Sequence, residues 1–402
     1  MNHRERVLTA LNHQEPDRVP IDFGGTVDSS ISALSYQALR ERLELGKNIT
    51  RVLDIHQQTA LIDDDVREKL DVDTSPLFYE PREWREDRLK DGSLVLFPEK
   101  FRPREEENGS QVIMNSEGIV TLRMPKDGYY FDSVYSPLRS ATSVKEIEKY
   151  RQEIECYDRP SYLDKSYEEL AEKAKTLLEN TDYCLVGFFG GHIFQACQSL
   201  RGWEQFLVDL VENQKFAEAL LERVTEANIQ RFEHYARTVA QYVHLIHFED
   251  DLGMQDRPLL SPKLYRKLIK PYQSRLFSFV KSRTKALILY HSDGAIYPFI
   301  PDFIEMGVDV LNPIQVSARG METKKLKKEF GKDISFWGAG CESQTILPFA
   351  SAEKVADEVK HRLDDLAPGG GFIFSPIHNI QAEVPVENVV TMFNTAREYG
   401  VY

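Results

Sequence analysis

The sequence predicts an α/β fold: a (β/α)8 TIM-type barrel with an N-terminal helical segment and an inserted antiparallel β excursion. From residue 143 onward, apolar strand-like runs alternate with amphipathic helical stretches at intervals of roughly 25 to 45 residues, which is typical of parallel βαβ units. Polar or reactive residues follow strand after strand, and a closed barrel gathers its active site at the carboxyl ends of its strands. A doubly wound open sheet would show the same alternation, so these strand-end residues favour the barrel.

The expected elements follow in chain order. Val7, Leu8 and Leu11 lie at helical spacing, and Pro16 and Pro20 end this segment before a strand-like VPIDFGG. Between about residues 78 and 135, the short alternating segments SLVLF, SQVIM and GIVTLRM are separated by turn clusters, which indicates the β excursion. The later barrel strands are expected at YCLVGFF (183–189), YVHLIHFED (242–250), KALILYH (285–291), VDVLNPI (308–314), DISFWGAG (333–340) and GGFIFSP (370–376). We expect one domain over residues 1–402, with the excursion inside it.

Composition narrows the class of partner. Lys and Arg total 50 against 64 Asp and Glu, a formal charge of -14, which disfavours a broad nucleic-acid surface. The opening residues are charged and no run of 18 apolar residues occurs, so we expect a cytoplasmic protein without a membrane partner. The four cysteines are too sparse for a disulfide framework and are expected to be reduced thiols. A small-molecule substrate remains.

Four groups of reactive residues follow expected strands. They are His247, Glu249, Asp250 and Asp251; His291 and Asp293; Cys341 and Glu342; and His378 and Asn379. In a barrel all four groups would face one mouth. Three adjacent acids at the end of a buried strand are costly without a cation or a polar cavity. Asp250 and Asp251 also fit a plain turn, and Asp293 before Gly294 also fits a turn with a helix N-cap.

The strand-end residues can form a metal site. His291 and Asp293, two residues apart, project to one face and can bind one ion. Cys341 and His378 could complete a zinc site with one position left open for substrate. Asp22, Gly24, Gly25 and Gly190 are expected at the mouth, where glycines allow close approach of a ligand, although tight turns explain the glycines equally well. Further substrate contacts are expected from polar residues near the strand ends, namely Gln255, Asn312 and Asn379.

Six longer segments carry a family resemblance: RERVLTALNHQEPDRVPIDFGGT, GGHIFQACQSLRGWEQFLVDL, FEDDLGMQDRPLLSPKLYRKLIKPY, LYHSDGAIYPFIPDFIEMGVDVLNPIQVSARGM, SFWGAGCESQTILPF and LAPGGGFIFSPIHNIQAEVPVENV. In order and spacing they resemble the uroporphyrinogen decarboxylase superfamily, and the resemblance extends over nearly the whole chain, with the β-rich stretch around residues 80–135 matching least. The resemblance implies a (β/α)8 barrel and one of two activities.

The two activities need different residues. True uroporphyrinogen decarboxylases are cofactor-free and bind the carboxylates of a tetrapyrrole with an arginine-rich N-terminal loop, like RPxWxMRQAGR. This chain has VPIDFGGT there, without an arginine cluster, so the carboxylates would lack bidentate partners. The other branch consists of zinc-dependent methyltransferases that work with a corrinoid protein. Their zinc is held by a His-x-Cys pair that matches His291-Ser292-Asp293, and by a later cysteine.

The resemblance therefore favours a zinc-assisted methyltransferase that moves a methyl group between a small-molecule donor or a thiol and a corrinoid on a partner protein. Asp293 replaces the expected cysteine, and the later cysteine is not near His378. Two ligand sets remain open: one with Cys341 as the thiolate, and one richer in oxygen. We expect His291, Cys341 and Glu249 as metal ligands, and His378, Asp250 and Asp293 as catalytic residues.

Two alternatives stay open. One is a metal-free tetrapyrrole decarboxylase, in which Asp250 or Asp73 would stabilise pyrrole protonation. The other is a catalytically silent ligand-binding barrel. The sequence leaves open the methyl donor and acceptor, the third metal ligand, and whether the protein is a monomer or a homodimer.

Overall fold

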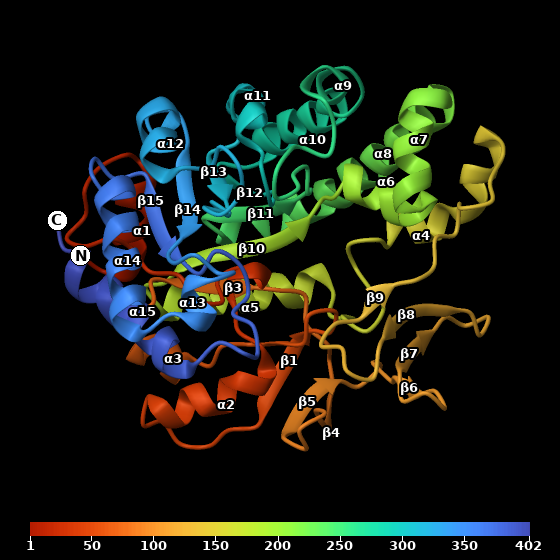
Figure 1. Cartoon of the computed structure of the whole chain (residues 1–402). Helices are drawn as coiled ribbons and strands as arrows, with labels where there is room; N and C mark the ends of the chain where they lie inside the picture. Colours follow the sequence, from red (N-terminus) through yellow and green to blue (C-terminus); the bar gives the residue numbers. More distant parts are fainter.

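A curled, fully parallel sheet forms the centre of the protein. The computed structural model describes residues 1–402. Seven strands are hydrogen-bonded in the order β15-β14-β13-β12-β11-β10-β3 (Figure 1). Their bounds are β3 Thr74–Leu77, β10 Cys184–Gly190, β11 Leu245–Glu249, β12 Leu287–His291, β13 Val310–Asn312, β14 Ser335–Ala339 and β15 Phe372–Ser375. All the strands expected after residue 143 are present, and β3, which is short and contains a proline, was not predicted.

The segment Pro20–Asp22 closes this sheet into a barrel. The N–H of Phe374 in β15 donates to the carbonyl of Pro20 at 2.9 Å, and the N–H of Asp22 donates back to the carbonyl of Phe374 at 2.8 Å. On the other side, the N–H of Asp73 donates to the carbonyl of Ile21 at 2.7 Å, immediately before β3 begins. The expected VPIDFGG strand thus bridges the two edge strands, which confirms the closed barrel over an open sheet.

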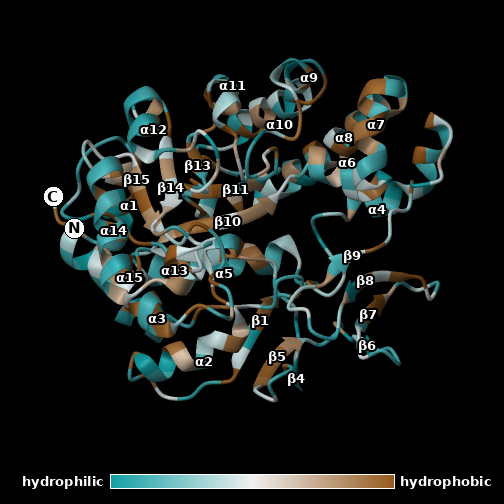
Figure 2. Ribbon diagram, in the orientation of Figure 1, coloured by the Kyte–Doolittle hydropathy of each residue, from teal (hydrophilic) through white to brown (hydrophobic).

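Helices cover the outside of the barrel, and their apolar faces pack on the strands, which are the most hydrophobic segments (Figure 2). The helices that follow β10 and the later strands are α6 Phe194–Arg201, α7 Trp203–Glu212, α8 Gln214–Thr238, α9 Pro262–Leu268, α10 Lys270–Arg283, α11 Ile300–Glu305, α12 Thr323–Phe330, α13 Ile346–Phe349, α14 Ala352–Leu366 and α15 Val386–Tyr399. The earlier helices are α1 His3–Leu11, α2 Ala33–Arg42, α3 Asp64–Lys69, α4 Arg151–Glu155 and α5 Tyr167–Asn180.

The N-terminal helix fills the amino end of the barrel. Val7, Ala10 and Leu11 of α1 form one buried cluster with the interior side chains Cys184, Val186, Leu245, Leu289, Val310, Trp337 and Ile373. The two chain termini lie close together at this end (Figure 1). An active site is therefore expected at the opposite, carboxyl end of the strands, where barrel enzymes have theirs.

The β excursion lies beside the carboxyl end of the barrel (Figure 1). Two four-stranded sheets have the orders β2-β1-β5-β4 and β6-β7-β8-β9. Their bounds are β1 Thr50–Asp54, β2 Thr59–Ala60, β4 Trp84–Arg88, β5 Leu94–Pro98, β6 Arg104–Glu105, β7 Gln111–Met114, β8 Val120–Met124 and β9 Asp132–Ser133. The pairing is antiparallel except between β1 and β5. The excursion is confirmed, but β1 and β2, which precede residue 78, extend it beyond the predicted range.

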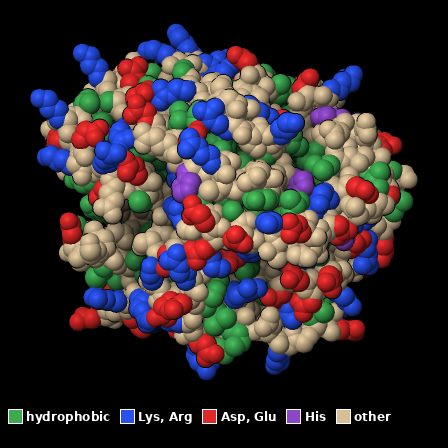
Figure 3. All heavy atoms as spheres, turned by 180° about the vertical axis from the view of Figure 1, so that it is seen from behind, with side chains coloured by type: hydrophobic (Ala, Val, Ile, Leu, Met, Phe, Trp, Pro, Cys, Tyr) green, Lys and Arg blue, Asp and Glu red, His purple; other side chains and the backbone are tan.

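The cysteines and the surface charges agree with the composition of the chain. All four cysteines are free, and Cys184, Cys197 and Cys341 are buried, as expected for reduced thiols. No helix combines the length and the apolar character that crossing a membrane requires. On the face opposite to that of Figure 1, acidic and basic side chains are interspersed without a continuous basic patch (Figure 3).

Candidate active site

Two neighbouring strands bring acids and imidazoles to the mouth of the barrel. β11 and β12 pair in parallel register, with Glu249 opposite His291. Because side chains alternate along a strand, His247, Glu249 and Asp251 share one side while Asp250 points to the other. Asp251 continues past the end of β11, and its Oδ1 lies 3.8 Å from His291 Nε2. The predicted gathering of strand-end residues is therefore present around His291.

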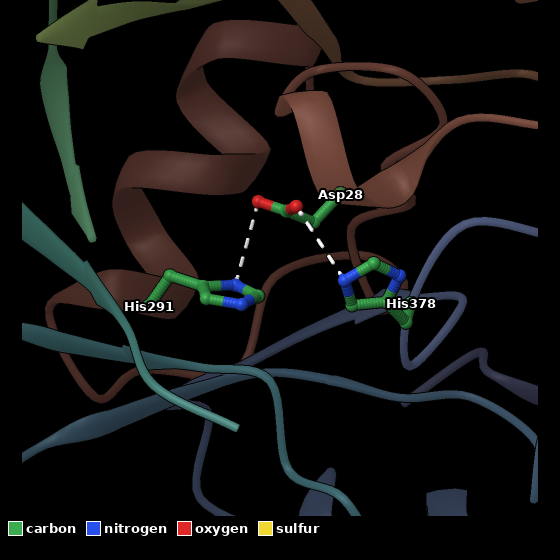
Figure 4. Close-up of side chains that lie close together, drawn as sticks. All are labelled: Asp28, His291 and His378. Atoms are coloured by element: carbon green, nitrogen blue, oxygen red, sulfur yellow. Dashed lines mark ion pairs between the residues drawn. The ribbon is translucent and has the colours of Figure 1, made fainter. Parts of the chain in front are cut away.

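Asp28 joins this group from a distant part of the chain. It lies in a 3-10 turn, Val27–Ser29, just after the segment that closes the barrel. Its carboxylate lies between two imidazoles, with Oδ2 3.4 Å from His291 Nδ1 and Oδ1 3.6 Å from His378 Nε2 (Figure 4). Sequence reasoning missed Asp28, because it follows no strand end directly and shares no motif with the histidines.

Hydrogen bonds at the second ring nitrogen separate the roles of His291 and His378. His291 Nδ1 lies 2.7 Å from Oδ1 of Asn312, whose Nδ2 donates to the carbonyl of Trp337 at 3.3 Å. An amide oxygen only accepts, so His291 Nδ1 carries a proton, and Nε2 is the nitrogen that an ion can bind by displacing the proton there. His378 Nδ1 instead accepts the backbone N–H of Asn379 at 2.9 Å. The neutral His378 ring therefore carries its proton on Nε2, the atom that faces the cluster.

The free Nε2 of His291 faces two carboxylates. Asp293 Oδ2 lies 3.6 Å away and Asp251 Oδ1 lies 3.8 Å away, distances too long for a strong hydrogen bond. Asp251, His291 and Asp293 each offer one ligand atom within 4.8 Å of the other two, so one ion can contact all three residues. One imidazole and two carboxylates suit a divalent cation such as zinc or manganese, and an orienting partner on the second nitrogen is typical of a metal-bound histidine. The donor set thus fits a metal, although without a thiolate.

Electrostatics tie these groups together. Burial, together with the charges of Glu249 and Asp293, raises the pKa of Asp28 well above its usual value. Burial lowers the pKa of His291, but Asp28, Asp293 and Asp251 outweigh burial and raise it well above the usual value. Burial and neighbouring imidazoles lower the pKa of His247 to about 4, so this ring is neutral at pH 7. Such perturbed groups at one mouth are typical of functional sites.

A buried chain of ion pairs supports Glu249. Its Oε2 lies 3.0 Å from His192 Nε2, and His192 Nδ1 bonds Asp158, which also pairs with Arg231. The pKa of His192 is raised well above its usual value because Asp158 and Glu249 outweigh burial. The imidazolium therefore fixes Glu249 from behind. The glycine pair before His192 signalled a turn, but nothing in the sequence linked it to Asp158 and Arg231.

A cavity of about 500 Å³ opens between this centre and the β excursion. Asp28, Glu249 and His192 belong to its wall, and most of the remaining lining is aromatic or aliphatic, with polar residues from the β1–β2 turn. None of its 19 lining residues is Lys or Arg; they are Val27, Asp28, Leu53, Asp54, His56, Gln57, Phe78, Tyr79, Ser133, Tyr157, Asp158, Pro160, Tyr162, Leu163, Phe188, His192, Gln195, Ser199 and Glu249. Its size suits a small molecule, and its walls offer no cation to an anionic one.

Cys341 does not reach the centre, which corrects the expected ligand set. Its thiol is fully buried in the main apolar core and belongs to none of the groups that could hold a metal. Burial and the charge of Glu358 raise its pKa, which opposes a thiolate. Gly338 and Ala339 have φ values of 115° and 56°, so the chain turns at the end of β14 and strand alternation no longer predicts where residue 341 points.

Asp250 is placed as a structural residue rather than at the reacting centre. Its Oδ2 accepts the N–H of Phe194 at 2.8 Å and its Oδ1 accepts the N–H of Gln195 at 2.7 Å, at the start of α6. Gln273 Nε2 also donates to Oδ2 at 2.9 Å. Both oxygens are therefore occupied. Asp73, the alternative acid of the decarboxylase hypothesis, is bound by Arg6 and Arg18 at the amino end of the barrel, away from the mouth.

The first expected mouth segment is also structural. Asp22 is fully buried, and its carboxylate accepts the Thr74 hydroxyl at 2.5 Å and the Trp337 indole N–H at 2.9 Å. The N–H of Gly24 donates to Ser29 and that of Gly25 donates to Asp22, so neither is free for a ligand. These three residues therefore hold the fold together through bonds within the chain, and none of them lines the cavity beside the centre.

The other predicted substrate residues have varied positions. A side chain at Gly190 would crowd Asp158 and His192, so this glycine makes room for their pair. Gln255 is exposed and joins a surface cluster of amides, with Oε1 accepting from Gln315 and Gln344. Asn312 orients His291 as described above. Asn379 is buried, and its Nδ2 donates to Gln57 of the cavity wall at 2.9 Å, so it lies behind the cavity.

A closed barrel with a buried imidazole–carboxylate centre at its carboxyl mouth has the architecture of a barrel enzyme. A family model described as Uroporphyrinogen decarboxylase (URO-D) matches residues 120–399. The chain therefore belongs to the uroporphyrinogen decarboxylase family.

One solved structure shares the fold over the whole chain. A methyltransferase from Methanosarcina mazei is similar over 99% of this chain and 99% of its own, with a TM-score of 0.60 and 16% sequence identity. A GH113 beta-1,4-mannanase covers 57% of this chain and 93% of its own, with a TM-score of 0.30 and 13% identity. The search of curated proteins found no match. At such identities the first similarity shows a shared fold.

Proposed function

We propose that this protein is a zinc-assisted methyltransferase that moves a methyl group between a small-molecule donor or a thiol and a corrinoid on a partner protein. The observation that carries the proposal is the free Nε2 of His291 facing Asp251 and Asp293 at the mouth of the barrel. These three residues would hold the ion, which when bound would act as a Lewis acid on a donor oxygen or lower the pKa of a thiol.

The neighbouring residues have definite tasks in this proposal. Asn312 holds the His291 ring in the tautomer that leaves Nε2 free. His378 presents its Nε2 proton toward the cluster, 3.7 Å from Asp293 Oδ2, where it can donate to an oxygen of the substrate. The aromatic walls of the cavity exclude water around the donor. Asp293 thus serves as a ligand rather than as a free acid or base.

The cavity disfavours the decarboxylase alternative. A tetrapyrrole with eight carboxylates needs guanidinium or ammonium partners, and no cationic Lys or Arg lines the wall, whereas Asp28, Asp54 and Glu249 do. An uncharged methyl donor avoids this mismatch. The proposal therefore expects an uncharged methyl ether to be a better substrate than a polycarboxylate.

Metal content and methyl transfer test the proposal together. Protein purified anaerobically without a polyhistidine tag is expected to contain at least one equivalent of zinc by mass spectrometry, and His291→Ala is expected to contain one equivalent less. Cys341→Ala is the matched control and should keep the metal, because its thiol lies outside the donor groups. With cob(I)alamin as acceptor, the loaded protein should form methylcob(III)alamin from a methyl ether, a methylated amine or a methyl thioether.

The contrary outcomes are distinct. Less than a tenth of an equivalent of metal, unchanged by His291→Ala, would end the metal-assisted version. Coproporphyrinogen formed from uroporphyrinogen would support the decarboxylase instead. Neither product, together with tight binding of a small molecule in the cavity, would support the silent barrel.

A further inference from the structure

A second set of donor atoms lies beside the first, on the cavity side of His291. It consists of His247 from β11, Glu249 two residues later, and Asp28 from the turn after the barrel-closing segment. Their ligand atoms also lie within 4.8 Å of one another. His291 belongs to the first group but not to this one, and its ring lies between the two because Nδ1 faces Asp28 while Nε2 faces Asp251 and Asp293.

The atoms of this set that face one another make no hydrogen bond within the protein. His247 is 0% exposed, and neither of its ring nitrogens makes a hydrogen bond. Asp28 Oδ2 and Glu249 Oε1 are likewise buried without a hydrogen-bond partner. Buried polar atoms are rarely left unpaired, and a histidine with both nitrogens unpaired is the most costly case here. Something outside the polypeptide is therefore expected to contact them.

The spacing of the atoms fits an ion better than mutual hydrogen bonds. His247 Nδ1 lies 3.5 Å from Glu249 Oε1, and its Nε2 lies 3.8 Å from Asp28 Oδ2. Two ligands of one tetrahedral zinc ion are about 3.3 Å apart when each bond is about 2.0 Å. Neither contact is as short as a nitrogen–oxygen hydrogen bond of about 2.9 Å. The two distances start from different ring nitrogens, and His247 can offer only one of them to an ion. The set that one ion can contact is therefore one atom from each residue, and three such atoms lie within 4.8 Å of one another.

The carboxylates around His291 also favour a second ion, because few of them have a cationic partner. Arg231 pairs with Asp158, and His192 pairs with Glu249 Oε2. Asp28, Asp251 and Asp293 remain without a Lys or Arg partner among the ion pairs of the protein. A single ion held by His291, Asp251 and Asp293 would leave Oδ2 of Asp28 and Oε1 of Glu249 buried without a hydrogen bond or a metal, which is costly.

We propose that the protein holds a second divalent metal ion, bound by His247, Glu249 and Asp28 on the cavity side of His291. The site takes a cation that prefers imidazole and carboxylate ligands, such as zinc, manganese or cobalt. Two of its ligands line the cavity, so an ion here would meet a substrate oxygen directly. The site goes beyond the single ion of the proposed methyltransferase and does not depend on methyl transfer.

Metal stoichiometry tests this site without reference to activity. Full-length protein is stripped with a chelator, loaded with Zn²⁺ or Co²⁺, desalted and analysed by mass spectrometry. The wild type is expected to hold two ions per chain, His247→Ala one, His291→Ala one, and the double variant none. His56→Ala is the matched control, because His56 lines the same cavity but belongs to neither donor group, and it should keep two ions.

A second variant distinguishes the loss of the ion from the loss of the fold. His247 is fully buried, so its alanine variant can unfold, whereas Glu249→Gln keeps the side-chain shape. Glu249→Gln should weaken the second ion at least tenfold in a chelator competition and remove its share of the visible absorption of Co²⁺-loaded protein. The second site would be overturned if the wild type held one ion that is lost in His291→Ala and kept in His247→Ala and Glu249→Gln. That result would leave the proposed function standing. If the wild type held two ions and the variants lost them as expected, but no methyl transfer occurred, the second site would stand and the proposed function would fail.

Discussion

At the scale of single residues, the partner of the second ring nitrogen decides what each imidazole can do. Asn312 Oδ1 accepts a hydrogen bond from the Nδ1–H of His291, which leaves Nε2 to bind an ion. The backbone N–H of Asn379 donates to Nδ1 of His378, so that ring carries a proton on Nε2. The two rings lie 5.8 Å apart and face the same carboxylates. Their different partners make His291 a ligand and His378 a hydrogen-bond donor in the proposed mechanism.

Asn312 should therefore control metal affinity without touching the metal. Asn312→Ala removes the acceptor of the His291 Nδ1 proton, and we expect metal affinity at the His291 site to fall about 10- to 100-fold. Competition with a fluorescent zinc chelator measures this change. Asn312→Asp keeps an acceptor at the same position and should stay within a few-fold of the wild type. Equal affinities for the alanine variant and the wild type would contradict the role given to Asn312.

Part of the centre could be predicted from strand alternation alone. His291 and Asp293 were predicted as a pair two residues apart, and the same parity places Glu249 and Asp251 together. Asp28 could not be predicted, because its position depends on how a turn after the first barrel segment folds back over the mouth. Cys341 was misplaced because two positive φ values at the end of β14 break the alternation on which its prediction rested.

At the scale of elements, β11 and α6 hold each other in place through Asp250. The start of a helix leaves N–H groups without partners, and Asp250 supplies both oxygens to them from the next strand. Apolar runs and turn residues were enough to predict the barrel strands. They could not show that one of three adjacent acids caps a neighbouring helix, because that contact joins elements about 55 residues apart.

Asp250→Ala is expected to destabilise the protein without removing the metal centre. The variant leaves the N–H groups of Phe194 and Gln195 and the amide of Gln273 unpaired, which should lower the free energy of unfolding by about 3 kcal/mol. Burial raises the pKa of the Asp250 carboxyl to about 6. Asp250→Asn keeps one acceptor and removes the buried charge, so the free energy of unfolding should fall by only about 1 kcal/mol.

Denaturant unfolding measures both values, and metal analysis of the folded fraction should give wild-type stoichiometry for both variants. If Asp250→Asn were as stable as the wild type but its rate of methyl transfer fell more than a hundredfold, Asp250 would be a catalytic residue.

At the scale of the whole molecule, the two ends of the barrel have different tasks. The carboxyl end carries the unpaired donors and the cavity, whereas the amino end is closed by α1 and by paired charges. Asp73 there accepts Arg6 Nη1 at 2.6 Å and Arg18 Nη1 at 2.7 Å, and His3 Nδ1 lies 2.8 Å from it. The paired charges around Asp73 stabilise the fold, whereas the unpaired donors at the carboxyl end are available to bind a ligand.

His244, at the amino end of β11, should make stability depend on pH. Its Nδ1 accepts the N–H of Leu185 at 3.0 Å, and burial together with the charge of Arg4 lowers its pKa to about 4. An unfolded histidine titrates near about 6.5. Between these two values the unfolded chain binds more protons than the folded one, so the stability from this neutral ring is fully present above about pH 6.5 and is lost as the pH falls toward about 4.

The expected loss from His244 is up to about 3 kcal/mol across that window. His244→Asn retains an acceptor for Leu185 but cannot take up a proton, so its stability should decline less between about pH 7 and about pH 4.5. Urea unfolding of the wild type and the variant at matched pH values gives the difference, in which the titration of all other groups cancels. Parallel pH profiles for the two proteins would show that His244 is already protonated in the fold, or that its bond to Leu185 does not depend on its charge.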